Sequence, residues 1–397
     1  MTPAPALSIC VPSRNRQFYF QETIRALLAS ARRDVEFVFT DNSDDPSIMD
    51  VFMAGVSDPR IRYLRSQDKP LSMVDNWERT MAAATGRWVA FIGDDDYVDP
   101  DVADLIATIE TRARDVDALA WNRLTFHWPG ARPEVMQTAI PTGCRIVEIR
   151  RDELMRKTFG WEGAGRVPTF MFSAYHAAVR RDLVEKNRAR FGNRYFEHPG
   201  VDQDSAFKII ATARRFVFSE RPFSVLGTCP VSNSASIGRV EETARRHAEF
   251  MADLGRNMDD DPHMADFPFP SAYGVTASVA VSQNWFRTAY GLQHDGWEEN
   301  FARSCALDCQ SAATREDFEI IRARYEAGFR AWKGGRFLPA FHPVYTEPSQ
   351  STGPSFSGVT PLLVHVAENF AGAASPRDLY DAAAGMMTPA IEIPVSL

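Results

Sequence analysis

Three consecutive carboxylates, Asp94, Asp95 and Asp96, follow the apolar run WVAFI in the sequence. Neighbouring carboxylates repel one another unless a cation or hydrogen-bond donors compensate their charge. A solvated turn ahead of a helix accounts for Asp99, which precedes Pro100 as an N-cap would, but it does not account for the triplet. Hard divalent cations such as Mg2+ and Mn2+ prefer oxygen ligands and bridge carboxylates to phosphate oxygens. The triplet therefore predicts a metal site beside a phosphate-bearing ligand.

Two other polar clusters follow apolar runs nearer the N-terminus. The first is VPSRNR, in which arginines bring positive charge, and the second is DNSDD, whose Asp and Asn side chains suit the edge of a base or a ribose. Between them and the triplet, the segment KPLSMVDNWERTMAAATG carries a lysine just before a predicted helix and an asparagine within it. Together these clusters predict a nucleoside diphosphate bound through metal. The candidate residues are Arg14, Arg16, Asp41, Asn42, Lys69 and Asn76.

Up to about Thr125, short apolar runs alternate with helix-patterned segments. This alternation predicts a largely parallel sheet with helices on both faces. Ligands of such sheets bind at the carboxyl ends of the strands, where the three clusters fall. The expected strands are LSICVP, VEFVFTDN, IRYLRS, RWVAFIG and VDALAWNRLTFHW.

The pattern changes along the rest of the chain. Residues 128–239 mix strand-like stretches such as FMFSAYHAAV and PFSVLG with helices, whereas the pattern beyond Val240 is mainly helical. We expect a domain over 1–239, made of a half that carries the nucleotide and metal candidates (1–127) and a second half (128–239). A helical C-terminal region follows over 240–397. The stretch EPSQSTGPSFSG predicts a linker or a mobile loop.

Composition limits the class of protein. The chain has 397 residues, 45% of them hydrophobic, and a formal charge of -8, so no global basic field exists to attract nucleic acid. Five scattered cysteines suit a reducing compartment better than a disulfide framework. The N-terminus lacks a signal-peptide pattern, and no apolar window is long enough to predict a spanning helix. We therefore expect a cytoplasmic protein.

The motifs VPSRNR, DNSDD, DNW and ATG are followed in this order by the aspartate triplet, which precedes the pair Pro100-Asp101. With these motifs, the first 130 residues resemble glycosyltransferase family 2, which has the GT-A fold. The resemblance implies an enzyme that transfers a sugar from a nucleoside diphosphate sugar, with a divalent metal (Mn2+ or Mg2+) and inversion at the anomeric carbon. Gly93 stands where the family commonly has the first Asp of its metal motif. Which residue of the triplet binds the metal therefore stays open. The resemblance places Pro12, Arg14, Asn15, Asp41, Asn42, Lys69, Asn76 and Asp94 at the nucleotide and Asp94, Asp95 and Asp96 at the metal.

The resemblance also implies a carboxylate base that takes a proton from the acceptor hydroxyl. The matching stretch is HPGVDQDSAFKIIATARR, in which Asp204 fits best and Asp202 is the second candidate. Gln203 stands where an acidic residue is usual. Asp202 could instead cap the helix that begins near Gln203.

The acceptor is expected beside the segment RKTFGWEGAGRVPTF, where Trp161, Glu162 and Arg166 are the candidates. Trp161 suits stacking on a sugar ring, although a tryptophan is more often a core residue. GT-A enzymes sometimes take a further metal ligand from a later histidine, for which His198 and His247 are candidates. The alternative is that both are ordinary core or surface residues.

The expected function is a metal-dependent inverting glycosyltransferase acting on a saccharide or a lipid-linked saccharide, in surface polysaccharide or O-antigen synthesis. UDP-sugars are the default donors. The alternatives are a non-catalytic binding module of the same fold and a sugar nucleotidyltransferase. The C-terminal helices would form a bundle that completes the fold or makes a homodimer, or else bring arginines to anionic lipid at the inner membrane face. These arginines are Arg245, Arg246 and Arg256, or Arg322, Arg324 and Arg330.

Overall fold

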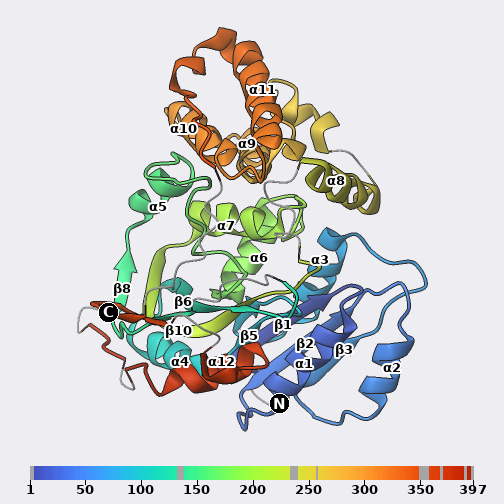
Figure 1. Cartoon of the computed structure of the whole chain (residues 1–397). Helices are drawn as coiled ribbons and strands as arrows, with labels where there is room; N and C mark the ends of the chain where they lie inside the picture. The colour runs from blue at the N-terminus through green and yellow to red at the C-terminus, as the bar shows by residue number, and fades with distance from the viewer. Residues whose placement is uncertain are drawn as a thin grey trace.

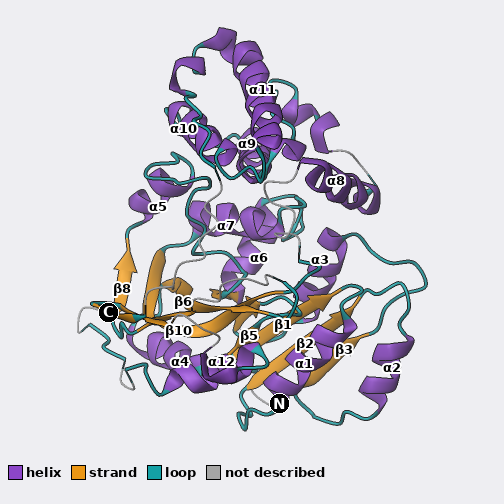
Figure 2. Ribbon diagram, in the orientation of Figure 1, coloured by secondary structure: helices purple, strands orange, loops and turns teal. Residues whose placement is uncertain are grey.

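The computed structural model describes residues 4–131, 138–232, 240–255, 258–347, 357–366, 370–388 and 391–394. Its centre is a mixed sheet of nine strands in the order β3-β2-β1-β4-β9-β6-β10-β5, with β8 paired to β10 (Figures 1 and 2). The strands are β1 Leu7–Ser13, β2 Val35–Asp41, β3 Ile61–Leu64, β4 Trp88–Phe91, β5 Tyr97–Val98, β6 Val116–His127, β8 Ile146–Ile149, β9 Ala177–Arg180 and β10 Arg215–Thr228.

The first four strands are parallel, as the alternating sequence pattern predicts. In register, Ser13 at the end of β1 lies beside Asp41 at the end of β2, and Cys10 of β1 lies beside Phe91 at the end of β4. The carboxyl ends of these strands, and the polar clusters that follow them, therefore meet at one edge of the sheet. β9 pairs antiparallel with both β4 and β6, while β6 and β10 run parallel.

Helices cover both faces of the sheet because successive strand residues point to opposite faces. Along β1, Leu7, Ile9 and Val11 belong to one hydrophobic core and Cys10 to the other. The first face is covered by α1 Gln17–Leu28, α2 Ser47–Ala54, α4 Val102–Arg112 and α12 Pro376–Ala384. The second is covered by α3 Met73–Ala83, α5 Arg151–Thr158, α6 Arg181–Arg190 and α7 Val201–Thr212.

A second helical layer lies beyond α7, at the top of Figure 1. Its helices share the hydrophobic core of α7, in which aromatic rings such as Phe286 and Phe207 are in contact (5.7 Å between centroids). The helical region is therefore packed onto the sheet domain. It consists of α8 Val240–Leu254, α9 Val275–Tyr290, α10 Glu298–Cys309, α11 Arg315–Ala331 and the short 3-10 turn η4 Ser271–Tyr273.

The last part of the chain leaves this helical layer and returns to the sheet domain. Strands β11 Gly358–Thr360 and β12 Leu363–Val366 form a small sheet with β7 Thr138–Pro141. Helix α12 lies beside α4 in Figure 1, and Tyr380 Oη donates a hydrogen bond to Asp99 Oδ2 (2.9 Å). The range 240–397 is therefore not helical throughout. Part of the predicted linker, residues 348–356, lies outside the described residues, as does most of the predicted domain boundary.

Candidate active site

The turn after β1 is shaped by Asn15, which adopts a left-handed backbone conformation (φ 56°). Asparagine tolerates this conformation better than most residues with a side chain. Its side-chain amide is paired with Asp44 after β2: Nδ2 donates to Asp44 Oδ2 (2.7 Å), and Oδ1 accepts from the backbone N–H of Asp44 (2.9 Å). The two strand ends are thus joined, and Arg16 is placed at the start of α1 with its side chain toward the turn after β4.

Arg16 lies between the first two aspartates of the triplet. Its Nε is 3.1 Å from Oδ1 of Asp94, and its Nη1 is 3.3 Å from Oδ2 of Asp95. The hydroxyl of Ser13 donates to Asp94 Oδ2 (2.6 Å), and that of Ser232 donates to Asp95 Oδ2 (3.0 Å). Both carboxylates are buried, so the guanidinium is the cation that compensates them in this state.

Asp96 points into the protein, away from Arg16. Its Oδ1 accepts a hydrogen bond from the backbone N–H of Gly227 (2.6 Å). Its Oδ2 accepts from the N–H of Gly93 (2.7 Å) and from Tyr175 Oη (2.6 Å), and lies 3.0 Å from Nε2 of His176. With four polar contacts, Asp96 serves to hold the turn and the neighbouring strands together.

The three carboxyl groups differ in pKa for physical reasons. Burial raises the pKa of Asp94 to about 7, with a further rise from the charge of Asp95, while Arg16 opposes the shift. Burial, followed by the charge of Asp96, also raises the pKa of Asp95. Burial acts in the same direction on Asp96, but His176 and the hydrogen-bond donors hold its pKa below the usual value. Asp94 and Asp95 are therefore the two members that an additional cation would stabilise.

These contacts define what the cluster offers to a metal. No three His, Cys, Asp or Glu side chains among the described residues are grouped so as to hold a metal ion. Oδ1 of Asp94 is buried and accepts no hydrogen bond from the part of the chain that is described, although Arg16 contacts it. Divalent cations at nucleotide sites commonly use one or two carboxylates, with substrate phosphates completing the shell. Asp94 and Asp95 could supply these one or two carboxylate ligands, although a metal would compete with Arg16 for them. Asp96 is already hydrogen-bonded inside the protein.

A second group of polar residues lies at the end of β2. Asp41 Oδ1 accepts hydrogen bonds from the backbone N–H (3.0 Å) and the hydroxyl (2.6 Å) of Ser43. Its Oδ2 is buried and has no hydrogen-bond partner among the described residues, and burial raises the pKa of this carboxyl group. Arg79 Nη2 donates both to the Asp41 carbonyl and to Asn76 Oδ1, each at 2.8 Å. The free oxygen of Asp41 suits an N–H donor such as that of a nucleobase.

The other predicted nucleotide residues have different environments. Asn42 exchanges two hydrogen bonds of 2.8 Å with the backbone of Leu71 and so anchors the loop before α3. Lys69 is exposed in that loop, and Pro12 is buried within β1. Asn42 therefore acts on the loop, and Lys69 is accessible to a ligand.

Arg14 connects the turn after β1 to the helical region. Its Nη1 lies 2.7 Å from Oδ2 of Asp253 on α8, and its Nη2 lies 3.2 Å from Oδ1 of Asp44. A second connection starts from α8, where Arg246 Nη1 donates to the carbonyl of Ser232 (2.6 Å). Helix α8 is thus connected to the sheet edge that carries Asp94 and Asp95 at two points, the turn after β1 and Ser232.

Asp204 is held inside a polar network at the start of α7. Its Oδ2 accepts hydrogen bonds from the backbone N–H groups of Glu197 (2.7 Å) and His198 (3.2 Å). The same oxygen lies 3.1 Å from Nζ of Lys208, and both side chains are completely buried. Lys208 also contacts Oε2 of Glu197 and the carbonyl of Tyr195, each at 2.7 Å. Asp204 therefore fixes the 195–204 segment, and burial raises its pKa although Lys208 opposes the shift.

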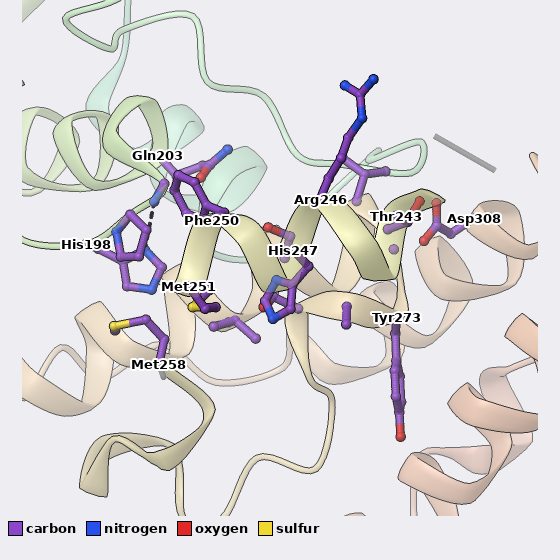
Figure 3. Close-up of a pocket in the computed structure, with 18 of the residues that line it drawn as sticks. His198, Gln203, Thr243, Arg246, His247, Phe250, Met251, Met258, Tyr273 and Asp308 are labelled. Atoms are coloured by element: carbon purple, nitrogen blue, oxygen red, sulfur yellow. Dashed lines mark hydrogen bonds between the residues drawn. The ribbon is translucent and has the colours of Figure 1, made fainter. Parts of the chain in front are cut away.

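Asp202, two residues earlier, lines a cavity of about 480 Å3 between α7, α8 and α9. Figure 3 shows other residues of this lining, among them His198 and Gln203. Of the two candidate bases, Asp202 lines this cavity and Asp204 does not, among the residues described. Gln203 Nε2 donates to Asp202 Oδ2 (3.2 Å), and burial raises the pKa of Asp202. Other lining residues include Met73, His198, Gln203, Val240, Thr243, Arg246, His247, Phe250, Met251, Met258, Tyr273, Val275, Val281, Asp308, Ile321 and Arg324.

The predicted acceptor residues are not among those that line this cavity in the described part of the chain. Trp161 is only 1% exposed, and its Nε1 donates to Gln283 Oε1 (2.7 Å). It is a core residue, so stacking on a sugar does not match its position. Glu162 pairs with Arg156 at the surface (3.0 Å), and Arg166 is half-buried, its carbonyl accepting from Thr276.

The remaining candidates also lie away from the aspartates. His198 and His247 line the cavity, where His198 Nδ1 accepts from the N–H of Gly200 (3.1 Å). Arginines proposed for lipid contact form ion pairs on their own helices, as Arg245 does with Glu242 and Glu249. Arg322 and Arg330 both pair with Glu326. Arg256 lies outside the described residues, and no described helix is long and apolar enough to cross a membrane.

Several site residues carry no signal in the sequence. Ser232, Tyr175 and His176 reach the aspartate turn from segments 79 or more positions away in the chain. Arg79 sits one turn after Asn76 on α3, so helical spacing from Asn76 would have pointed to it. The other three need the strand order before they can be placed.

The sequence model of Glycosyl transferase family 2 matches residues 8–186 of the chain. The chain carries a family 2 glycosyltransferase domain. The match covers the ends of β1, β2 and β4, with Arg16, Asp41 and the aspartate triplet. It ends before α7, so neither Asp202 nor Asp204 lies within the matched part of the family 2 domain.

A curated relative is 31% identical over 93 residues: GalNAc(5)-diNAcBac-PP-undecaprenol beta-1,3-glucosyltransferase of Campylobacter jejuni subsp. jejuni serotype O:2. The match covers 23% of this chain and 30% of that protein, so the chain spans less than a third of the relative's length. Among solved structures, S. aureus TarS 1–349 with UDP-GlcNAc has a TM-score of 0.42 at 12% identity, covering 84% of this chain and 89% of that one. The mannosyltransferase PcManGT of Pyrobaculum calidifontis, with GDP-Man and Mn2+, has a TM-score of 0.37 at 13% identity, covering 86% and 84%.

Proposed function

We propose that the chain transfers a sugar from a nucleoside diphosphate sugar to an acceptor hydroxyl with inversion of the anomeric carbon. The observation that supports this most is the arrangement of Ser13, Arg16, Asp94 and Asp95 at one edge of the sheet in a family 2 domain. A cavity with the carboxylate of Asp202 in its wall adjoins α3 and α8. The arrangement offers an anion-binding edge and a separate proton acceptor.

The donor would occupy the ends of β1, β2 and β4. Asp41 offers a buried, unpaired oxygen to the base, and Asn15 and Asp44 keep the two turns together. Arg16, beside Asp94 and Asp95, would offer positive charge to the diphosphate, and Lys69 is also accessible. A divalent metal held by Asp94 and Asp95 would neutralise charge that grows on the leaving nucleoside diphosphate. UDP-sugars are the first donors to test, and GDP- and TDP-sugars follow.

Asp202 would act as the base, in preference to Asp204. As the acceptor oxygen forms its bond to the anomeric carbon, an oxygen of Asp202 takes the hydroxyl proton. The bond from that carbon to the phosphate oxygen breaks, and its electron pair leaves with the nucleoside diphosphate. One displacement inverts the carbon and requires no covalent enzyme intermediate. Burial raises the pKa of both Asp202 and Asp204, which suits a general base. Position favours Asp202, because it lines the cavity, whereas Oδ2 of Asp204 already accepts hydrogen bonds and pairs with Lys208.

The acceptor would be a saccharide or a lipid-linked saccharide, by analogy with the curated relative, whose name contains an undecaprenol-linked saccharide. We place this reaction in surface polysaccharide assembly, in the cytoplasm or at the inner face of the membrane. Self-association through the helical region is part of the same proposal.

The test is a donor panel with the full chain. Release of nucleoside diphosphate from one nucleotide sugar, inhibited by EDTA and restored by Mn2+, supports the proposal. Activity that EDTA leaves unchanged would contradict the proposed role of a divalent metal. Ligand binding without turnover of any donor would favour a non-catalytic module and contradict the proposed transfer.

A further inference from the structure

Helix α8 presents an unusual inward face. Its half-buried residues recur at helical spacing, at Val240, Thr243, His247, Phe250 and Met251. These same residues line the cavity. Yet none of the fifteen residues of α8, all of them described, is buried. An amphipathic helix is ordinarily stabilised by burying its apolar face against a core. Here Val240, Met251 and Leu254 pack against the neighbouring core, but the face is only half-buried because it also borders the cavity.

The opposite walls of the cavity are also largely apolar. Met73 contributes from α3, Met258 from the turn after α8, Val281 from α9 and Ile321 from α11. Figure 3 shows Phe250, Met251 and Met258 grouped on the side of His198 and Gln203. Methionine side chains are flexible and polarizable, so they adapt to apolar ligands of varied shape.

The cavity shares a residue with the proposed catalytic centre. Asp202 forms part of its wall. Its α8 wall contacts the donor side twice, through the ion pair of Asp253 with Arg14 and through the hydrogen bond from Arg246 to Ser232. The hydroxyl of Ser232 in turn donates to Asp95. An occupant of the cavity would therefore lie beside the proposed base, Asp202.

We propose that this cavity binds an apolar group attached to the acceptor, next to the hydroxyl that Asp202 deprotonates. The acceptor is then an amphipathic glycoside with an aliphatic or aromatic aglycone, not a free saccharide. Polar lining residues such as Asp202, Gln203 and Arg246 remain available to the sugar hydroxyls, whereas a sugar placed against the Phe250, Met251 and Met258 side would lose hydrogen bonds to water. This inference rests on the proposed function and specifies the substrate class of the same site.

The test measures binding of methyl, butyl, hexyl and octyl β-D-glucosides, below their micelle concentrations, to the full chain by calorimetry. Affinity should rise with chain length by up to about fourfold per methylene, which corresponds to ~0.8 kcal/mol. Met251→Trp, which fills the cavity, should abolish this dependence. Ala252→Trp on the exposed side of the same helix is the matched control and should retain it.

Binding of nucleoside diphosphates to the same three proteins is measured separately. If it is retained while methyl and octyl glucosides bind alike, the apolar subsite is refuted and the proposed function stands. Equal weakening by Met251→Trp and Ala252→Trp would also refute the subsite, because the glucosides would then be binding elsewhere. If no nucleoside diphosphate binds, the proposed function fails, and the assignment of the cavity to an acceptor fails with it. Retained nucleoside diphosphate binding by Met251→Trp also shows that this variant is folded.

Discussion

Replacing Asp202 by Asn should lower the rate of transfer without lowering the stability of the fold. The side chain is half-buried, and its hydrogen bond from Gln203 (3.2 Å) can be kept by an amide oxygen. Burial raises the pKa of Asp202 above its unfolded value, so its charge destabilises the folded chain at neutral pH, and Asn should cost no stability. Loss of a general base typically lowers the rate 10²–10⁴-fold, or about 3–5 kcal/mol in the barrier. We expect transfer to fall by that factor with unchanged binding of nucleoside diphosphate.

Asp204→Asn is the matched control, two residues away on the same helix. Removing one partner of a buried ion pair commonly costs about 3–5 kcal/mol. Because Lys208 keeps its contact with Glu197 at 2.7 Å, we expect the lower end of this range, about 3 kcal/mol. Transfer should remain within about tenfold of wild type, a loss far smaller than that of a general base. Urea unfolding and initial rates measure the two effects. If Asp204→Asn abolished transfer at normal stability while Asp202→Asn stayed active, the assignment of the base would be refuted.

Three further predictions concern the same structure. The rate of transfer should fall on acidification through the pKa of Asp202, at a higher pH than an ordinary aspartate would give, because burial raises that pKa; a pH profile flat down to pH 4 would contradict this. Arg16→Ala should weaken nucleoside diphosphate binding at least tenfold and destabilise the chain by about 3 kcal/mol at pH 8, since it leaves buried carboxylates without their cation. That loss should be smaller at pH 6, where Asp94, with a pKa of about 7, is largely protonated; equal losses in urea unfolding at both pH values would refute the explanation. Tyr380→Phe removes the hydrogen bond to Asp99 and should cost about 1–2 kcal/mol in thermal unfolding, and no loss would argue against docking of the C-terminal helix on the sheet.

The parallel half of the sheet could be predicted because its signals are local. Each of β1 to β4 is an apolar run ended by polar residues, and helical spacing separates successive runs. The rule that such strand ends meet at one edge then placed Asp41 and the aspartate triplet together. By contrast, β12 pairs with β7, more than two hundred residues earlier in the sequence, and α12 reaches back to Asp99 through Tyr380. No local pattern marks such a return.

The directions in which side chains point could not be predicted from the sequence either. The spacing of Asp94, Asp95 and Asp96 suggested three ligands, but Asp96 turns inward because Gly227, Tyr175 and His176 provide its donors. The placement of Arg16 between the other two follows the left-handed conformation of Asn15, which sequence alone does not determine.

The same holds for the two aspartates of α7. Both Asp202 and Asp204 lie in its first turn. Only the position of Lys208 and of the cavity shows which of them is held in a network and which is open to a ligand.

The most direct test of the central claim is calorimetric titration of UDP, GDP and TDP, with and without Mn2+, into wild type and Asp95→Asn. Asp95 lies at the sheet edge beside Arg16 and Ser232. We predict that at least one nucleoside diphosphate binds the wild-type chain and that the substitution weakens its binding at least tenfold. Binding of none of the three, or equal binding to both proteins, would contradict a donor site at this edge.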